Sequence, residues 1–139
     1  MATKERKGEP FSIRLSADTD RLVSAEARRT RRSKSAVVES LAEEAARVRR
    51  FPGIGFRGDD FSRNAWVIGT GLDVWEVIQM SQEFASDAAL VRDTQLTDGQ
   101  LRLARAYHAE FPAEIDEAIA ENTRPLEEWR SLYPFVGQR

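Results

Sequence analysis

The sequence contains no cysteine and only one histidine, His108, among its 139 residues. The missing thiols exclude disulfides, thiolate metal sites and cysteine nucleophiles, and they are typical of a protein in a reducing cytoplasm. A single histidine excludes a metal centre built from several histidines. No apolar run approaches the roughly 20 residues that span a bilayer, and the first residues are charged where a signal peptide is apolar. We therefore expect a soluble cytoplasmic protein that needs no cofactor.

Residue patterns that support catalysis are equally scarce. Three glycines between residues 53 and 58 lack the strand-to-helix context of a phosphate-binding loop, so we interpret them as turn glycines. The acidic pairs at residues 59–60 and 116–117 have no expected electrophile or metal ligand beside them. His108 shares a helical stripe with apolar residues such as Leu101, which predicts a packed histidine rather than a catalytic one. The sequence favours a binding protein over an enzyme.

Charge is divided unevenly along the chain. Residues 1–50 hold 13 Lys and Arg and 8 Asp and Glu, a net charge of +5, whereas residues 51–139 hold 8 and 15, a net charge of −7. The first part therefore suits a polyanion such as nucleic acid, which the second part would repel. We expect a flexible basic arm (1–9), a DNA-binding and dimerisation domain (10–50), an acidic, partner-binding helical domain (51–122) and an aromatic tail (123–139).

Residues 10–50 carry the pattern of one short strand followed by two helices. Apolar and polar residues alternate from Phe11 to Leu15, as in a strand with one buried face. Two serine N-cap candidates predict helices from Ala17 to about Thr30 and from Lys34 to about Arg49. A single strand leaves both edges unpaired, and roughly 40 residues bury too little surface to fold alone. The strand is therefore expected to pair antiparallel with a second copy in an obligate homodimer.

A resemblance to a known family rests on two segments of this region, PFSIRLS and TRRSKSAVVESLAEEA. At their spacing they resemble the ribbon-helix-helix family of DNA-binding proteins, the Arc and MetJ type, which includes many antitoxins. In that family a two-stranded ribbon enters the major groove, and its outward side chains contact base edges. The resemblance implies base reading by Ser12 and Arg14, with Pro10 at the third outward position. Arg31 departs from the family, because a glycine is usual after the first helix.

The chemistry of these side chains suits such a role. The guanidinium of Arg14 can pair with guanine through two hydrogen bonds, and the Ser12 hydroxyl can donate to or accept from several bases. Backbone N–H groups at the start of the second helix, in Ser33, Lys34 and Ser35, are predicted to bind phosphate together with the Lys34 ammonium. Further phosphate attraction is expected from the arm residues Lys4, Arg6 and Lys7. The alternative is a solvated strand face, with Arg28 to Arg32 merely complementing a helix dipole.

Residues 51–139 show a different pattern. Two short strands are predicted at residues 54–56 and 65–68, joined by a polar loop from Arg57 to Asn64. Helices are predicted to start at a capping box of Asp73 with Glu76, near Ser86, at a capping box of Thr97 with Gln100, at Pro112 and at Pro125. The aromatic residues Trp66 and Trp75 are interpreted as core rather than as a ligand platform.

A second resemblance rests on the segments FPGIGFRG, AWVIGTGLDVWEVI and LTDGQLRLARAYHAEFPAEID. They resemble the domain of unknown function number 433, found in predicted bacterial antitoxins. The resemblance implies a small helical domain with a short hairpin, winged-helix or homeodomain-like, that neutralises a PIN-type ribonuclease toxin. The helices around residues 95–97 would also fit a second helix-turn-helix, but a net charge of −7 argues against DNA contact there.

The tail contains Trp129, Tyr133 and Phe135, too many aromatic residues for a solvated terminus. It either docks on its own domain or anchors a protein partner. The expected fold is thus mainly α: an intertwined ribbon-helix-helix dimer followed by a small helical domain with a β-hairpin. The expected function is that of an antitoxin in a type II toxin–antitoxin pair, which binds its operator and neutralises a ribonuclease-like toxin. The alternative is a free-standing transcriptional regulator with a ligand-sensing or structural second domain.

Overall fold

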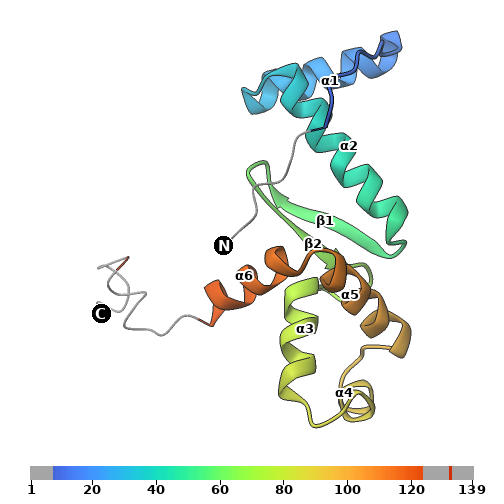
Figure 1. The fold of residues 1–139 in the computed structure, drawn as a ribbon, viewed down its shortest axis with the longest axis vertical. Helices are drawn as coiled ribbons and strands as arrows, with labels where there is room; N and C mark the ends of the chain where they lie inside the picture. Colours follow the sequence, from blue (N-terminus) through green and yellow to red (C-terminus); the bar gives the residue numbers. More distant parts are fainter. Residues whose placement is uncertain (1–7, 124–131, 133–139) are drawn as a thin grey trace. The chain divides into compact units, whose positions relative to one another are not determined.

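The computed structural model describes residues 8–123 and Leu132. Within residues 8–123 the chain forms six helices and one three-stranded antiparallel sheet (Figure 1). The prediction of a mainly helical fold with a small hairpin is confirmed at this level. The chain divides into two compact units, one ending at Glu43 and the other beginning at Glu44, and each is described by itself. Among the described residues, no helix is long and apolar enough to cross a bilayer.

The first unit contains α1 (Ala17–Thr30) and most of α2 (Lys34–Arg50), at the bounds that the serine caps predict. The Ser16 hydroxyl accepts a hydrogen bond from the backbone N–H of Thr19 at 3.2 Å. The Ser33 hydroxyl does the same for Ala36 at 3.1 Å. Each serine therefore satisfies one of the backbone donors that a helix start leaves without a partner.

The predicted strand from Phe11 to Leu15 does not form within one chain. Residues 8–16 have no regular secondary structure, and the side chains of Phe11 and Ile13 are 84% and 55% exposed. The expectation that these residues face a core is therefore not met inside a single copy. The physical reason is that a strand needs a second strand for its backbone groups, and residues 8–43 contain none to offer.

The second unit contains a hairpin of β1 (Ile54–Asp59) and β2 (Ser62–Val67), which pair in register from Ile54↔Val67 to Asp59↔Ser62. The predicted polar loop from Arg57 to Asn64 is wrong, because only residues 60 and 61 remain unpaired between the strands. Polar residues can extend a hairpin where both of its faces are exposed to solvent. Such a strand shows no alternation of apolar and polar residues, so the sequence pattern does not reveal it. A third strand, β3 (Leu72–Asp73), pairs with β2 and is too short to show a period.

Four helices follow the sheet: α3 (Val74–Glu83), α4 (Asp87–Asp93), α5 (Asp98–Glu110) and α6 (Pro112–Asn122). Their predicted starts are confirmed. The backbone N–H of Asp73 donates to Glu76 Oε1 at 3.0 Å, and Thr97 exchanges the two hydrogen bonds of a capping box with Gln100 at 3.0 and 3.1 Å. The helix predicted from Pro125 lies outside the described residues.

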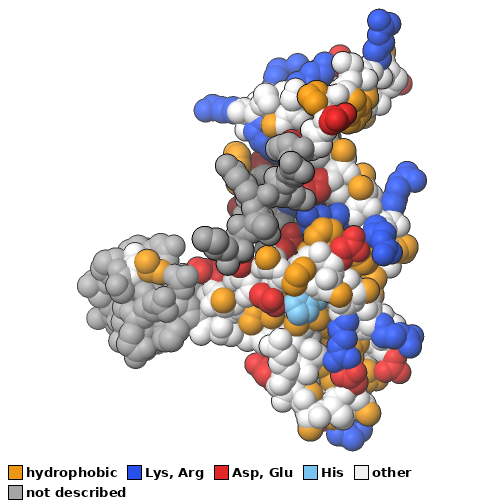
Figure 2. Space-filling model, viewed as in Figure 1, with side chains coloured by type: hydrophobic (Ala, Val, Ile, Leu, Met, Phe, Trp, Pro, Cys, Tyr) orange, Lys and Arg blue, Asp and Glu red, His pale blue; other side chains and the backbone are white. Residues whose placement is uncertain are grey.

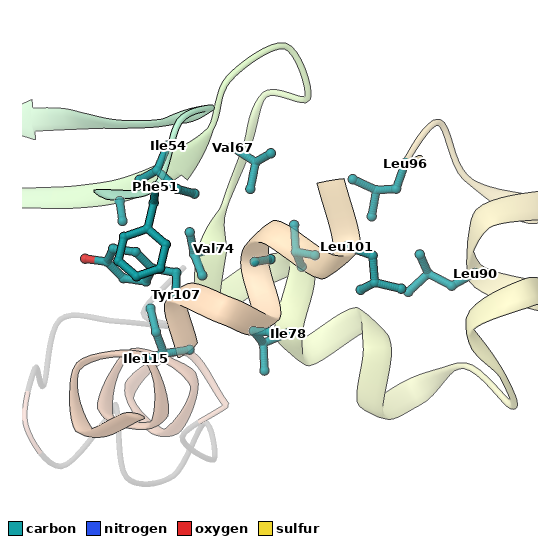
Figure 3. Packing of buried hydrophobic residues seen from close by; sticks show 13 residues of the cluster. Phe51, Ile54, Val67, Val74, Ile78, Leu90, Leu96, Leu101, Tyr107 and Ile115 are labelled. Atoms are coloured by element: carbon teal, nitrogen blue, oxygen red, sulfur yellow. The ribbon is translucent and has the colours of Figure 1, made fainter. Parts of the chain in front are cut away.

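The core of the second unit is drawn from the sheet and from all four of these helices. Its side chains meet in one cluster (Figure 3) that includes Phe51, Ile54, Val67, Val74, Ile78, Leu90, Leu96, Leu101, Tyr107 and Ile115. On α5 the buried line runs through Tyr107, and His108 lies beside it, with Nε2 2.8 Å from Asp116 Oδ1 on α6. The predicted core packing of His108 therefore needs correction: the ring is only partly buried and pairs with a carboxylate at the margin.

The last two turns of α2 pack with the second unit. The Arg47 guanidinium donates to the Tyr107 hydroxyl and to Glu114, both at 2.8 Å, and lies 3.8 Å from the centre of the Phe111 ring. The Tyr107 hydroxyl in turn donates to Glu114 at 2.6 Å, and Figure 3 shows its oxygen at the edge of the apolar cluster. Burial, together with Glu114, raises the pKa of Tyr107 above its ordinary value, so the hydroxyl stays neutral. The division between the units therefore lies inside α2, rather than after residue 50 as the Pro52 and Gly53 signals suggest.

This arrangement predicts which fragment of the chain is stable. A fragment of residues 44–139 should have a free energy of unfolding about 2 kcal/mol higher than a fragment of residues 51–139, because only the longer one keeps the Arg47 hydrogen bonds. Thermal and urea unfolding monitored by circular dichroism measure the difference. Arg47→Ala in the longer fragment is the matched control and should remove most of it. Equal stability of the two fragments would contradict the assignment of these turns to the second unit.

Candidate nucleic-acid interface

The three predicted base-reading residues lie in the extended segment before α1. Pro10, Ser12 and Arg14 occupy alternate positions, and all three are exposed. The apolar residues between them, Phe11 and Ile13, are exposed as well, so a single chain does not yet present a polar face backed by a buried one. The structure therefore leaves the predicted reading residues accessible, while the ribbon that would carry them is not formed in one copy.

The start of α2 is the predicted phosphate site. Lys34 forms an ion pair with Asp20 of α1, which sequence spacing does not predict because the two residues lie on different helices. The side chains of Lys34 and Asp20 are 51% and 47% exposed, and an ion pair this exposed contributes about 0–1 kcal/mol. A phosphate can therefore compete for the ammonium at small cost. Ser33 caps the helix as described above, and Ser35 is exposed.

The basic stretch from Arg28 to Arg32 contains residues with different environments. Arg32 donates to the Ser40 hydroxyl at 2.7 Å and to the Ala36 carbonyl at 3.3 Å, so it holds the turn against α2. Arg28, Arg29 and Arg31 are exposed, and Arg29 also pairs with Glu26 at 2.7 Å within α1. Figure 2 shows Lys and Arg side chains gathered over this part of the chain. The stretch thus combines a structural arginine with exposed positive charge.

Arg31, which follows the last residue of α1, adopts the left-handed backbone conformation with φ 54° and ψ 41°. Its own N–H and that of Arg32 donate to the carbonyls of Arg28 and Ala27, which ends α1 with a tight turn. An L-residue with a Cβ pays a steric penalty in this conformation that glycine does not. The turn therefore closes α1 with a strained residue at position 31.

The basic residues of the second unit are mostly neutralised by nearby carboxylates. Between residues 51 and 123, four of the five arginines pair with aspartate or glutamate: Arg57 with Asp73, Arg63 with Glu44, Arg92 with Asp93 and Arg105 with Asp87. The Arg105 guanidinium donates to Asp87 at 2.6 Å, and this hydrogen bond lowers the pKa of the Asp87 carboxyl. Arg102 remains exposed. A second helix-turn-helix built on α5 would therefore approach phosphates with little available positive charge.

The remaining predicted site residues lie outside the described residues. These are the arm residues Lys4, Arg6 and Lys7 and the tail residues Trp129, Tyr133 and Phe135. Trp66 and Trp75, predicted as core, are half-buried; the Arg57 guanidinium lies 4.7 Å from the Trp66 ring, and Trp75 Nε1 donates to Asp73 at 3.2 Å. In the described ranges, no three His, Asp or Glu side chains come together as a metal ion would require.

Comparisons with protein-family models, with curated proteins and with solved structures find no match to this chain. The two family resemblances therefore stay expectations drawn from the residues quoted above.

The strain at Arg31 gives a direct test of the turn. Arg31→Gly should raise the free energy of unfolding of the first unit by about 1 kcal/mol, because glycine adopts the left-handed conformation without a Cβ clash. Arg31→Ala is the matched control: it removes the same charge, keeps the Cβ, and should change stability by less than about 0.5 kcal/mol. Urea unfolding at one fixed protein concentration measures both. If the two variants are equally stable, residue 31 is not strained in solution.

Proposed function

We propose that this chain is a homodimeric DNA-binding protein of the ribbon-helix-helix type whose acidic second domain, winged-helix or homeodomain-like, binds and neutralises a basic, ribonuclease-like toxin. In this proposal the protein is the antitoxin of a type II pair and represses its own operator. The observation that carries the proposal is the segment from Phe11 to Leu15, in which apolar and polar residues alternate and which has no strand partner and exposed side chains in a single copy.

The first unit buries too little apolar surface to be complete. Val23 and Val37 are its buried apolar residues among those described, whereas Phe11, Ile13, Leu22 and Leu41 are exposed. Full burial of a side chain of this size contributes about 1.5–3 kcal/mol, so leaving four of them in water is unfavourable. A second copy related by a two-fold axis would cover these residues and supply the missing antiparallel strand. Both needs are met by the same partner.

Pairing of two segments would also orient the predicted reading residues. In an antiparallel ribbon with Phe11, Ile13 and Leu15 facing the helices, Ser12 and Arg14 of both copies share the opposite face. A two-stranded ribbon fits the major groove, where Arg can pair with guanine through two hydrogen bonds. The α2 start, with Lys34 and the exposed N–H groups, would then contact phosphate.

The second unit supports a protein partner rather than DNA. From Glu44 to Arg139 this unit holds 11 Lys and Arg against 16 Asp and Glu, a net charge of −5, and its described arginines are mostly paired. Such a surface attracts a basic protein by long-range electrostatics and repels a polyanion. A ribonuclease presents a basic groove to its substrate, so its charge complements this unit. The same charge suits no nucleic-acid ligand.

The dimer is tested by the mass of the full chain in solution. Sedimentation equilibrium should give about twice the 15.7 kDa of one chain. Ile13→Glu should dissociate the dimer, because it places a charge in the proposed interface. Ile68→Glu is the matched control, since Ile68 is also exposed but lies in the second unit. A monomeric chain, or an Ile13→Glu variant that stays dimeric, would contradict the proposed assembly.

DNA reading is tested by binding to the DNA upstream of the chain's own gene and to random duplex. Arg14→Ala should weaken binding to the upstream DNA by about 1–3 kcal/mol per contacted base and spare random DNA. Lys34→Ala should weaken both alike and lower the salt slope by about 1. Arg21→Ala, which removes an exposed α1 arginine paired with Asp18, serves as the charge control. Equal losses on both DNAs for Arg14→Ala would exclude base reading.

A further inference from the structure

The turn between β1 and β2 presents an aromatic side chain to solvent. Phe61 is 80% exposed, which is the largest exposed fraction among the large apolar side chains described in the second unit. Figure 1 shows this turn at the end of the β1–β2 ribbon that points away from α3 and α4. A phenylalanine exposed on a turn can supply binding free energy if a partner buries it, because burial of an aromatic side chain is favourable.

The turn that carries Phe61 is held in place from both sides. The Arg63 guanidinium donates to the carbonyls of Phe56 at 3.1 Å and Gly58 at 3.4 Å, and it forms an ion pair with Glu44 of α2. Asp59 Oδ1 accepts the backbone N–H of Phe61 at 3.0 Å. Gly58 has a φ of +120°, and a Cβ there would lie 2.3 Å from the Ser62 carbonyl oxygen, so only glycine fits. A turn whose backbone is held in this way presents its aromatic side chain with little further ordering of the backbone on binding.

The charge beside Phe61 indicates what kind of surface it suits. Two aspartates, Asp59 and Asp60, directly precede it in the chain. The arginines of the same hairpin leave the charge of Asp59 in place, because Arg57 pairs with Asp73 and Arg63 pairs with Glu44. A phenylalanine beside a carboxylate suits DNA poorly, because DNA phosphates repel the carboxylate. It complements an apolar pocket whose rim carries Lys or Arg.

We propose that Phe61 is the anchor by which this chain binds its protein partner, inserting into an apolar pocket rimmed by basic side chains, with Asp59 pairing to that rim. The inference rests on the proposed function, and it places the docking site on the β1–β2 turn rather than on the aromatic tail alone. A central aromatic anchor next to charges typically dominates the affinity of such an interface.

The experiment measures the affinity of the full chain for the protein encoded by the neighbouring reading frame, by calorimetry at several salt concentrations. Phe61→Ala should weaken binding by about 30-fold or more. Asp59→Asn should weaken it by about 3- to 10-fold and reduce its salt dependence, because the amide oxygen still accepts the Phe61 N–H while the charge is lost. Ile68→Ala is the matched control, at an exposed apolar residue outside the turn, and should change affinity less than about 3-fold.

The outcomes separate the anchor from the proposed function. If the unaltered chain binds and Phe61→Ala binds equally well, the anchor is wrong and the proposed function stands. If the unaltered chain does not bind, the proposed function fails and the anchor fails with it. The unfolding temperature of Phe61→Ala should be unchanged, because the side chain has little packing to lose. A lower oligomeric state or weaker DNA binding in this variant would show that Phe61 contacts a second copy or DNA, and either result overturns the anchor.

Discussion

The backbone N–H and C=O groups of residues 11–15, which have no strand to pair with in one copy, are the constraint on which our account of the first unit depends. A strand cannot satisfy its own N–H and C=O groups, and no other strand lies among the described residues of this unit. The same residues carry the exposed apolar side chains Phe11 and Ile13 and the predicted base-reading residue Arg14. Dimerisation, core formation and DNA reading therefore depend on one event in our proposal: two copies of this segment meeting antiparallel. A chain that fails to pair loses all three together.

A second constraint is the continuity of α2, which begins in the first unit and ends in the second. Its last turns are held by a partly buried network in which Arg47 donates to Tyr107 and Glu114. Removing Arg47 leaves the Tyr107 hydroxyl and the Glu114 carboxylate without this donor, which destabilises the second unit by the roughly 2 kcal/mol given above. The helix therefore cannot be cut at the composition boundary after residue 50 without disturbing the acidic unit. Residues 34–43 of α2 belong to the first unit, and residues 44–50 belong to the second.

Local signals predicted much of the fold. The bounds of α1 and α2 and the starts of α3 and α5 follow from caps and helical periodicity, which involve residues only a few positions apart. Alternation in residues 11–15 predicted that Phe11 and Ile13 face a core, and in a single copy both side chains are exposed along with Ser12 and Arg14. What was missed involves contacts between distant residues: the ion pair of Lys34 with Asp20, and the Arg47 network. A basic residue near a helix end normally indicates solvent, so nothing in the sequence distinguishes Arg47 from its neighbours.

Hydrogen exchange at the backbone of residues 11–15, in the full chain, tests the central claim most directly. In a paired ribbon these amides exchange slowly, and dilution below the dimer dissociation constant restores fast exchange. Our account predicts slow exchange at high protein concentration and its loss on dilution. Fast exchange at residues 11–15 under conditions in which α1 and α2 remain protected would show that no ribbon forms, and the proposed DNA-binding dimer would be wrong.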